Sequence, residues 1–210
     1  MKKILRYTLA IVLLLYFLAT FIVSPILDKR MNLVEYSDPR QLGTEAQELY
    51  NSLEFIADLH CDALLWDRDL TKQLDYAHLD FPRMQQANMS LQAFTIVTKS
   101  PKGQNFKQNS ADAFDEITML NFVQGRLPDK WFSLYKRAEY QARALQDYQK
   151  KFAGKFLLVK SRQDLKKLIA LKKTDPEVIG GFLGIEGAHC LEGNLDNVQN
   201  LYYEGVRMMA

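Results

Sequence analysis

The sequence is short of the features that mark proteins without a conventional core. Only two of its 210 residues are cysteines, so a network of disulfides cannot hold the fold together. It contains no internal repeat and no low-complexity tract. These absences exclude a disulfide-stapled miniprotein, a collagen-like fibre and a disordered tail. The 48% of apolar residues is instead typical of a folded globular protein.

A large excess of either charge is also missing. The chain has 27 basic and 25 acidic residues, and three of the basic ones, Lys2, Lys3 and Arg6, precede the first acidic residue, Asp28. After residue 27 there are 24 basic and 25 acidic side chains. Such a near-neutral body lacks the broad positive field that binds phosphate backbones, so we do not expect a nucleic acid partner.

Charged residues are absent from residues 7–23, where an apolar run covers every face of a helix. Counted over residues 4–27, the segment is near the length that spans a bilayer. Basic residues precede it, which predicts a single-pass anchor, a cytoplasmic N-terminus and an exported (periplasmic or extracellular) body. The alternative is a cleaved signal peptide, but residues 21–25 are too bulky for a small-x-small cleavage site. We predict a transmembrane signal anchor at residues 1–27 and a juxtamembrane linker at residues 28–53.

Export bears on the two cysteines, Cys61 and Cys190. In an oxidising compartment they could form one disulfide. A single pair is too little for a disulfide framework, and two buried free thiols are the simpler interpretation.

Beyond the linker, short apolar runs alternate with stretches of helical periodicity. Strands separated by helices predict βα units and a parallel sheet. The runs are residues 55–62, 91–98, 156–160, 180–186 and 205–210. The last run ends with the chain, although a parallel strand needs neighbours and a covering helix, so we interpret the sequence as truncated.

Helix signals lie between these runs. Asp129 is a candidate N-cap for a long helix over residues 130–153, which Gly154 ends. Ser161 and Asp164 form a capping-box pattern before another helix. Two further helices are predicted over residues 41–51 and 195–204.

Three polar side chains stand at the end of the first run. Side chains alternate along a strand, so Asp58, His60 and Asp62 are predicted to share one face. The carboxyl end of a parallel strand is where α/β proteins build their sites. An imidazole and a carboxylate two residues apart can hold a divalent transition metal such as zinc. A histidine bonded to a nearby carboxylate is also an ordinary structural pair, and the residues alone leave both interpretations open.

Glu186 ends the fourth run, with Gly184 before it and Gly187 after it. Small neighbours leave room for an ion and a substrate beside the carboxylate, which could bridge two metals. The same pattern fits a glutamate on a polar loop whose glycines only turn the chain.

Taken together, the two motifs and their spacing closely resemble the membrane dipeptidase (renal dipeptidase) family of zinc metallopeptidases. The resemblance covers residues 54–210 and includes weaker motifs between and after the two. The matching segments are Asp58-Leu59-His60-Cys61-Asp62, Asp80-Phe81-Pro82-Arg83-Met84, Leu91-Gln92-Ala93-Phe94, Gly184-Ile185-Glu186-Gly187-Ala188-His189 and residues 201–209. The departures are mild: Asn88-Met89 stands where the family has a glycine pair, and Ala188 and Cys190 replace its commoner Gly and Ser.

The resemblance implies a (β/α)8 TIM-barrel metallohydrolase that hydrolyses dipeptides with two zinc ions at the C-terminal mouth of the barrel. His60 and Asp62 would bind one zinc and Glu186 would bridge both. Asp58 would contact His60 and orient it without binding the metal itself. Residues 54–210 would be the N-terminal part of this barrel, truncated after about its first half.

The family's remaining metal-binding histidines come from later strands, beyond Ala210. His78 lies in a different segment, and His189 matches a motif histidine that is not a zinc ligand. We therefore expect little peptidase activity from these 210 residues alone. Two alternatives stay open. One is another amidohydrolase-like barrel, although such barrels usually open with His-x-His rather than His-x-Asp. The other is a membrane-tethered remnant without catalysis.

Overall fold

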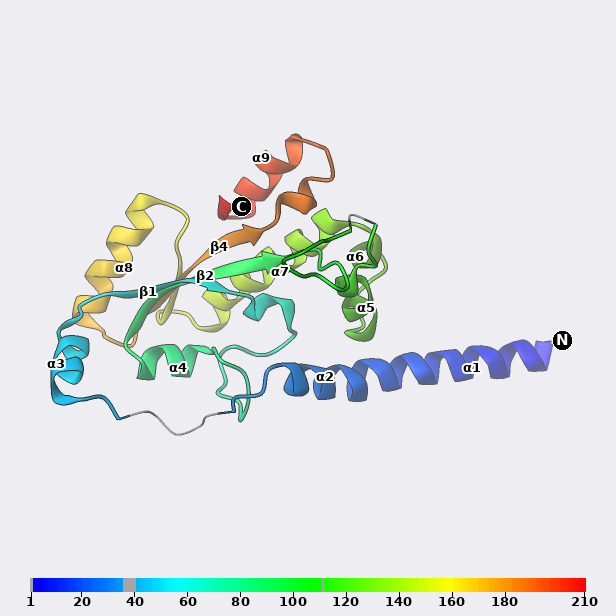
Figure 1. The fold of residues 1–210 in the computed structure, drawn as a ribbon, viewed down its shortest axis with the longest axis horizontal. Coiled ribbons are helices and arrows are strands. Elements are labelled where there is room, and N and C mark those ends of the chain that lie inside the picture. Colours follow the sequence, from blue (N-terminus) through cyan, green and yellow to red (C-terminus); the bar gives the residue numbers. More distant parts are fainter. Residues whose placement is uncertain (1, 36–40, 111) are drawn as a thin grey trace.

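The computed structural model describes residues 2–35, 41–110 and 112–210. A long N-terminal helix leads into a body in which parallel strands alternate with helices (Figure 1). The helix consists of α1 (Lys2–Leu18), a π-helical turn over Ala19–Val23 and α2 (Ser24–Met31). Pro25 lies in the first turn of α2, directly after the π-helical turn.

The N-terminal helix has the length and composition needed to cross a membrane. It runs over Lys2–Met31, and within the described ranges it is the one helix that meets this description, which a signal sequence also fits. A short helix, α3 (Thr44–Ser52), follows, so the predicted helix at residues 41–51 is confirmed with a start three residues later.

All five predicted apolar runs form strands of one parallel sheet, as expected. The strands are β1 (Ile56–Cys61), β2 (Met89–Val97), β3 (Phe156–Leu158), β4 (Ile179–Glu186) and β5 (Val206–Met209). β4 pairs with β2 along one side, whereas its other side pairs first with β3 and then with β5. Strands β1, β2, β4 and β5 thus follow one another in chain order, as consecutive strands of a barrel do.

Along the chain, the helices of the body come between these strands. They are α4 (Phe81–Gln86), α5 (Glu116–Val123), α6 (Asp129–Phe132), α7 (Leu134–Lys151), α8 (Arg162–Thr174) and α9 (Asp196–Tyr203). The predicted capping of α8 is confirmed, because the Ser161 hydroxyl accepts the Asp164 N–H at 3.1 Å. The predicted end of the last helix is confirmed by Gly205, which has φ +101°.

The prediction of one uninterrupted helix over residues 130–153 is wrong. The helix is interrupted at Ser133, whose extended backbone (φ −107°, ψ 120°) separates α6 from α7. The Ser133 hydroxyl accepts the Lys136 N–H at 3.2 Å and caps α7, while Asp129 is only the first residue of α6. A serine oxygen that satisfies a free backbone N–H is the physical reason for the new start.

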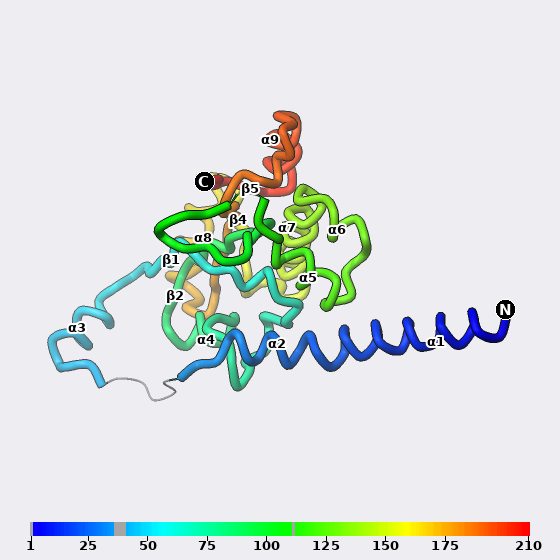
Figure 2. Tube along the Cα trace, turned by 45° about the vertical axis from the view of Figure 1, so that its right-hand side comes forward, coloured from blue at the N-terminus to red at the C-terminus, as the bar shows by residue number. Residues whose placement is uncertain are grey.

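The main core lies between the sheet and helices α4 and α7. Phe81 of α4 stacks on Phe156 of β3, with ring centroids 4.7 Å apart, and meets Phe94 of β2 edge-on. Leu145 of α7 is fully buried in the same cluster. Figure 2 shows the helices gathered around the sheet while the N-terminal helix extends past the body. The packed body leaves the carboxyl ends of the strands free to carry a site.

Candidate metal centre

The carboxyl ends of β1 and β4 lie at the same edge of the sheet, with β2 between them. His60 lies next to the end of β1, Asp62 follows that strand, and Glu186 is the last residue of β4. Because the three strands are parallel, their ends meet at one edge, and residues 124 positions apart become neighbours.

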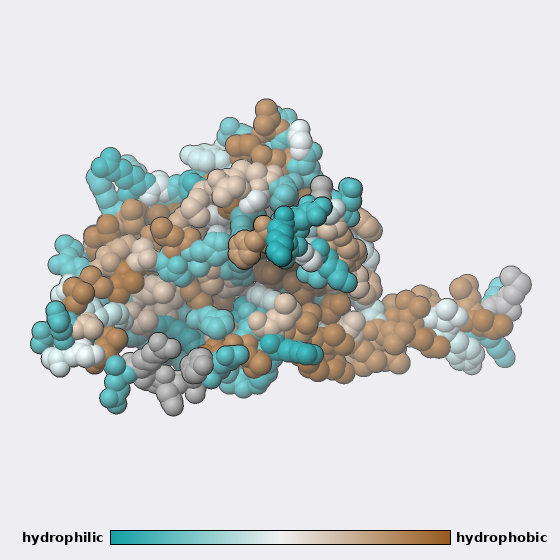
Figure 3. Space-filling model, in the orientation of Figure 1, coloured by the Kyte–Doolittle hydropathy of each residue, from teal (hydrophilic) through white to brown (hydrophobic). Residues whose placement is uncertain are grey.

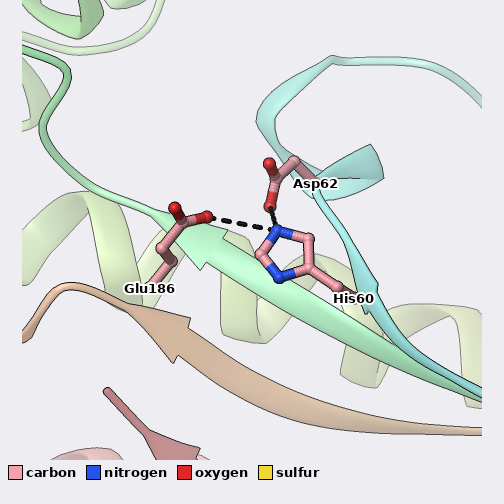
Figure 4. Close-up of side chains that lie close together, drawn as sticks. All are labelled: His60, Asp62 and Glu186. Carbon is pink, nitrogen blue, oxygen red and sulfur yellow. Dashed lines mark ion pairs between the residues drawn. The ribbon is translucent and has the colours of Figure 1, made fainter. Parts of the chain in front are cut away.

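Figure 4 shows the three side chains pointing toward one another. His60 Nε2 lies 3.2 Å from Glu186 Oε2 and 3.4 Å from Asp62 Oδ1. One ligand atom from each residue lies within 4.8 Å of the other two. The side chains of His60, Asp62 and Glu186 are 55%, 39% and 55% exposed, so an ion and a substrate can reach them from solvent.

The arrangement fits a metal ion better than an ordinary ion pair. One imidazole nitrogen can donate only one proton, so it cannot satisfy two carboxylates at once. Two ligands about 2.1 Å from a tetrahedral zinc are about 3.4 Å apart, close to both observed separations. One imidazole and two carboxylates form a donor set suited to zinc or a similar ion, whereas magnesium and calcium prefer oxygen ligands alone.

Asp62 is fixed by a residue that the sequence interpretation did not identify. The Thr95 hydroxyl, near the carboxyl end of β2, donates a hydrogen bond to Asp62 Oδ1. Thr95 is almost fully buried on the side of the sheet that carries the site. A hydroxyl near the end of a mostly apolar strand was the signal of this role in the sequence.

The predicted unbroken alternation along β1 is wrong. Asp58 pairs with Gln92 and Cys61 with Phe94, so three steps on β1 face two steps on β2. This bulge puts Asp58 on the same side of the strand as Cys61 rather than His60. The Asp58 carboxylate accepts the backbone N–H of His60 at 3.2 Å, so its contact is with the main chain of His60.

Two glycines shape the end of β4, as their positions in the sequence suggested. A Cβ on Gly184 would lie 2.8 Å from Met208 Cε and 3.5 Å from Thr95 Cγ2, so glycine lets the Met208 side chain pack against β4 here. Gly187 has φ +74°, and a Cβ there would lie 2.9 Å from the His189 ring. Glycine is therefore needed for the turn that directly follows the ligand residue.

The other candidate residues lie outside this group. His189 borders the cleft but does not join the cluster of ligand atoms, and His78 lies in the segment between β1 and α4. Cys61 and Cys190 are both free thiols, and only Cys190 is fully buried. Burial raises the pKa of the Cys190 thiol to about 11. Cys190 therefore stays protonated near neutral pH, and it does not belong to the group of His60, Asp62 and Glu186.

The cluster opens into a cleft of about 580 Å³. Asp62 and Glu186 line one side, and α5 forms another wall. Leu27 and Met31, at the end of the N-terminal helix, also line the cleft. Nothing in the sequence indicated this, because Leu27 ends the predicted anchor and Met31 lies in the predicted linker.

The segment leading to α5 is held in place by Asp115. Burial raises the pKa of this carboxyl, but hydrogen bonds from Arg137 and from the Ser100 N–H outweigh it, so the net pKa lies below its usual range. Arg137 is itself buried and also donates to the Thr98 carbonyl oxygen at 2.7 Å. These contacts fix the wall of the cleft that faces Glu186.

Two solved structures are similar to the chain. One, described as dipeptidase AC, a metallopeptidase of family M19, is 19% identical over 74% of this chain and 43% of its own, with a TM-score of 0.51. The other, a metallopeptidase from Rhodobacter sphaeroides liganded with a phosphinate mimic of the dipeptide L-Ala-D-Ala, is 18% identical over 73% of this chain and 44% of its own, with a TM-score of 0.50. The chain thus spans less than half the length of these proteins, and the likeness shows the fold.

No curated protein matches the chain. A match to a family of enzymes covers residues 44–210, which includes α3 as well as the predicted residues 54–210. That family consists of TIM-barrel metallohydrolases, and the consecutive parallel strands β1, β2, β4 and β5 agree with the predicted fold class. The chain belongs to the membrane dipeptidase family, peptidase family M19.

Proposed function

We propose that the chain is the N-terminal part of a membrane-anchored, zinc-dependent dipeptidase. Residues 1–27 are the transmembrane signal anchor, residues 28–53 the juxtamembrane linker, and residues 54–210 the first half of the catalytic barrel. The family match, which begins at residue 44, and the coverage of less than half of two related solved chains support the assignment of residues 54–210 to part of a catalytic barrel.

One observation carries the proposed function: His60, Asp62 and Glu186 converge from two strands at the mouth of a cleft. His60 and Asp62 would hold one zinc, and Glu186 would bridge it to a second zinc. Bound zinc polarises the scissile carbonyl and lowers the pKa of water toward neutrality.

The residues of this chain set the geometry for that chemistry. Glu186, the last residue of β4, would be the carboxylate shared by the two ions. Thr95 holds the Asp62 carboxylate, and Asp58 holds the main chain of His60. Second partners of this kind orient ligands in other metal sites.

The substrate is a dipeptide, including ones with a D-residue on the C-terminal side. A related protein carries a mimic of L-Ala-D-Ala, and the cleft here offers charges of both signs to a zwitterion. Lys99 and Glu116 lie on its walls, together with apolar side chains such as Leu65 and Met119. Apolar walls and a few charges can accept small side chains between a free amine and a free carboxylate.

The anchor places this cleft outside the cytoplasm. Lys2, Lys3 and Arg6 precede the apolar helix, so the N-terminus stays cytoplasmic and the barrel is exported. The protein is then a single-pass membrane enzyme that acts on periplasmic or extracellular dipeptides.

The test compares two substitutions on either side of one turn in the intact protein. Glu186→Gln should abolish dipeptide hydrolysis and lower the zinc content, because an amide cannot bridge two cations as a carboxylate does. His189→Gln, three residues later on the edge of the cleft, should leave the zinc content unchanged. Zinc per chain is measured by elemental analysis beside the rate of hydrolysis. Equal loss of zinc in both variants would overturn the assignment of Glu186.

A further inference from the structure

The N-terminal helix does not stand clear of the body. From Tyr16 onward its less exposed residues recur every three or four positions, at Thr20, Ser24, Leu27 and Asp28. This spacing marks one face of a helix. Figures 1 and 2 both show this part of the helix beside α5. More than half of the helix is therefore docked along the body.

Two contacts fix the docking at its membrane-side end. The Tyr16 ring packs against Phe122 of α5, with centroids 5.4 Å apart. Further along, Thr20 approaches Gly125 so closely that a Cβ on this glycine would lie 2.7 Å from Thr20 Cγ2. Gly125 has φ +72°, so glycine suits this position both for the backbone and for the close approach.

The other end of the helix is held by buried polar groups. The Asp28 carboxylate lies 3.7 Å from Arg68 Nε and accepts a hydrogen bond from the Tyr76 hydroxyl at 3.2 Å. Asp28 is only 7% exposed, and the Arg68 side chain is buried with it. The Asn32 carbonyl oxygen also accepts the Ala77 N–H at 2.8 Å. Undocking would leave the buried Arg68 without this partner, which is costly.

The docked face and the membrane span overlap. Residues 4–27 rise about 36 Å at about 1.5 Å per residue, whereas the hydrocarbon core of a bilayer is about 30 Å thick. Tyr16 lies only about 18 Å along this span from residue 4. If the membrane span begins at residue 4, Tyr16 and Thr20 lie within the hydrocarbon core. The surface of the body that contacts these two residues then also lies below the outer boundary of the core.

The surface of the body at that level is apolar. An apolar groove of about 550 Å³ lies between α1 and the α5–α6 region and is lined by Val12, Leu15, Phe122, Leu127 and Trp131. Leu127 and Phe132 are 66% and 82% exposed. In Figure 3 the brown surface of the N-terminal helix adjoins brown residues at the neighbouring edge of the body. Exposed Leu and Phe beside a Trp are typical of surfaces that enter the boundary between headgroups and acyl chains.

Charges in this region are already neutralised. Residues 119–132 include three charged side chains, Arg126, Asp129 and Lys130. Arg126 is buried and pairs with Asp67 at 2.9 Å. Asp129 and Lys130 pair with each other, also at 2.9 Å. Paired charges lower the cost of placing the region against lipid.

We infer that the α5–α6 surface, formed by Phe122, Leu127, Trp131 and Phe132, is a second membrane contact that dips into the outer leaflet beside the anchor. The inference rests on the proposed membrane anchor, and its partner is the lipid bilayer itself. The cleft, which α5 also borders, then opens close to the membrane surface.

The two tryptophans of the chain, Trp66 and Trp131, provide the test. The chain is reconstituted in phosphatidylcholine and phosphatidylglycerol vesicles whose acyl chains carry bromine, a quencher of tryptophan in contact with lipid. Trp66→Phe leaves Trp131, and Trp131→Phe leaves Trp66, which lines the cleft. A third variant has both replacements and Leu15→Trp, which reports on the anchor.

We expect Trp131 to lose most of its emission in brominated vesicles and Trp66 to keep most of its own. In the Trp66→Phe background, Leu127→Ser with Phe132→Ser should restore much of the Trp131 emission, because the polar surface no longer enters the lipid. Quenching at residue 15 without quenching of Trp131 would overturn the second contact while the anchor stands. Quenching at neither position would overturn both. An unquenched Trp131 that acrylamide cannot reach would show that protein, rather than lipid, covers the surface.

Discussion

Strands β1 and β4 carry the three candidate ligands, but they are built in opposite ways. β4 lies inside the sheet, pairs with three other strands and is buried up to its last residue, Glu186. β1 lies at the edge, pairs only with β2 and has a bulge before its end. Its Leu59 is 63% exposed.

This difference shows two ways of holding a ligand. Glu186 is placed by the packing of the strand beneath it, where glycines let neighbouring side chains close in from both faces. His60 and Asp62 depend on individual hydrogen bonds: the His60 N–H donates to Asp58, and the Thr95 hydroxyl donates to Asp62. We therefore expect changes in β4 to affect the fold first, and changes around β1 to affect metal affinity first.

The largest expected effect is on the β4 side of this comparison. A Cβ on Gly181 would lie 2.7 to 2.9 Å from ring atoms of Phe94 and Phe156. Gly181→Val should therefore lower the free energy of unfolding by about 3 kcal/mol, because the packed rings cannot move aside. The matched change on β1 is Ala57→Val, at an exposed position, with an expected effect within about 0.5 kcal/mol. Urea denaturation of both variants measures the difference, and equal values would contradict the contrast between the strands.

The next effect concerns metal affinity on the β1 side. Thr95→Val removes the hydroxyl that donates to Asp62 and should weaken zinc binding about 10- to 100-fold, as loss of a ligand's hydrogen-bond partner does elsewhere. Zinc affinity is measured by competition with a chromogenic chelator.

Thr98→Val is the matched control. Thr98 is also buried, just past the end of β2, but its hydroxyl has no hydrogen-bond partner among the described residues. Its replacement should leave zinc affinity unchanged and the fold at least as stable, because an unpaired buried hydroxyl is removed. The same loss of zinc in both variants would mean that general loosening of β2, rather than the bond to Asp62, controls the site.

Much of the fold could be predicted because buried parallel strands appear in a sequence as continuous apolar runs. Each predicted run forms a strand, and the ends of β1 and β4 bring together His60, Asp62 and Glu186, the candidate ligands named from the sequence. The pairing of β4 with three strands was not predictable, because it depends on where short strands begin along a neighbour.

The features that could not be predicted from the sequence depend on contacts between distant segments. The break before α7 is stabilised by Glu192, whose carboxylate accepts the Leu134 N–H across 58 positions. The bulge that moves Asp58 to the other side of β1 depends on the register with β2. Leu27 reaches the cleft only because the N-terminal helix docks on the body. Local periodicity records none of these, since each needs a partner from a distant segment.

The smallest effect separates the two thiols near the ligands. Cys190 follows the end of β4 and is fully buried, with a pKa of about 11, so only about one molecule in a thousand is a thiolate at pH 8. Cys61 on β1 is partly exposed. In the native protein, Cys61→Ser should therefore react with a disulfide reagent far more slowly than Cys190→Ser, which retains Cys61. The slow rate should rise about tenfold per pH unit up to about pH 11, and guanidinium should make the two variants equal. Fast labelling of Cys190 in the native protein would mean that the turn after Glu186 opens. The contrast between a packed β4 and a loosely held β1 would then fail at the end of β4, where the candidate ligand Glu186 lies.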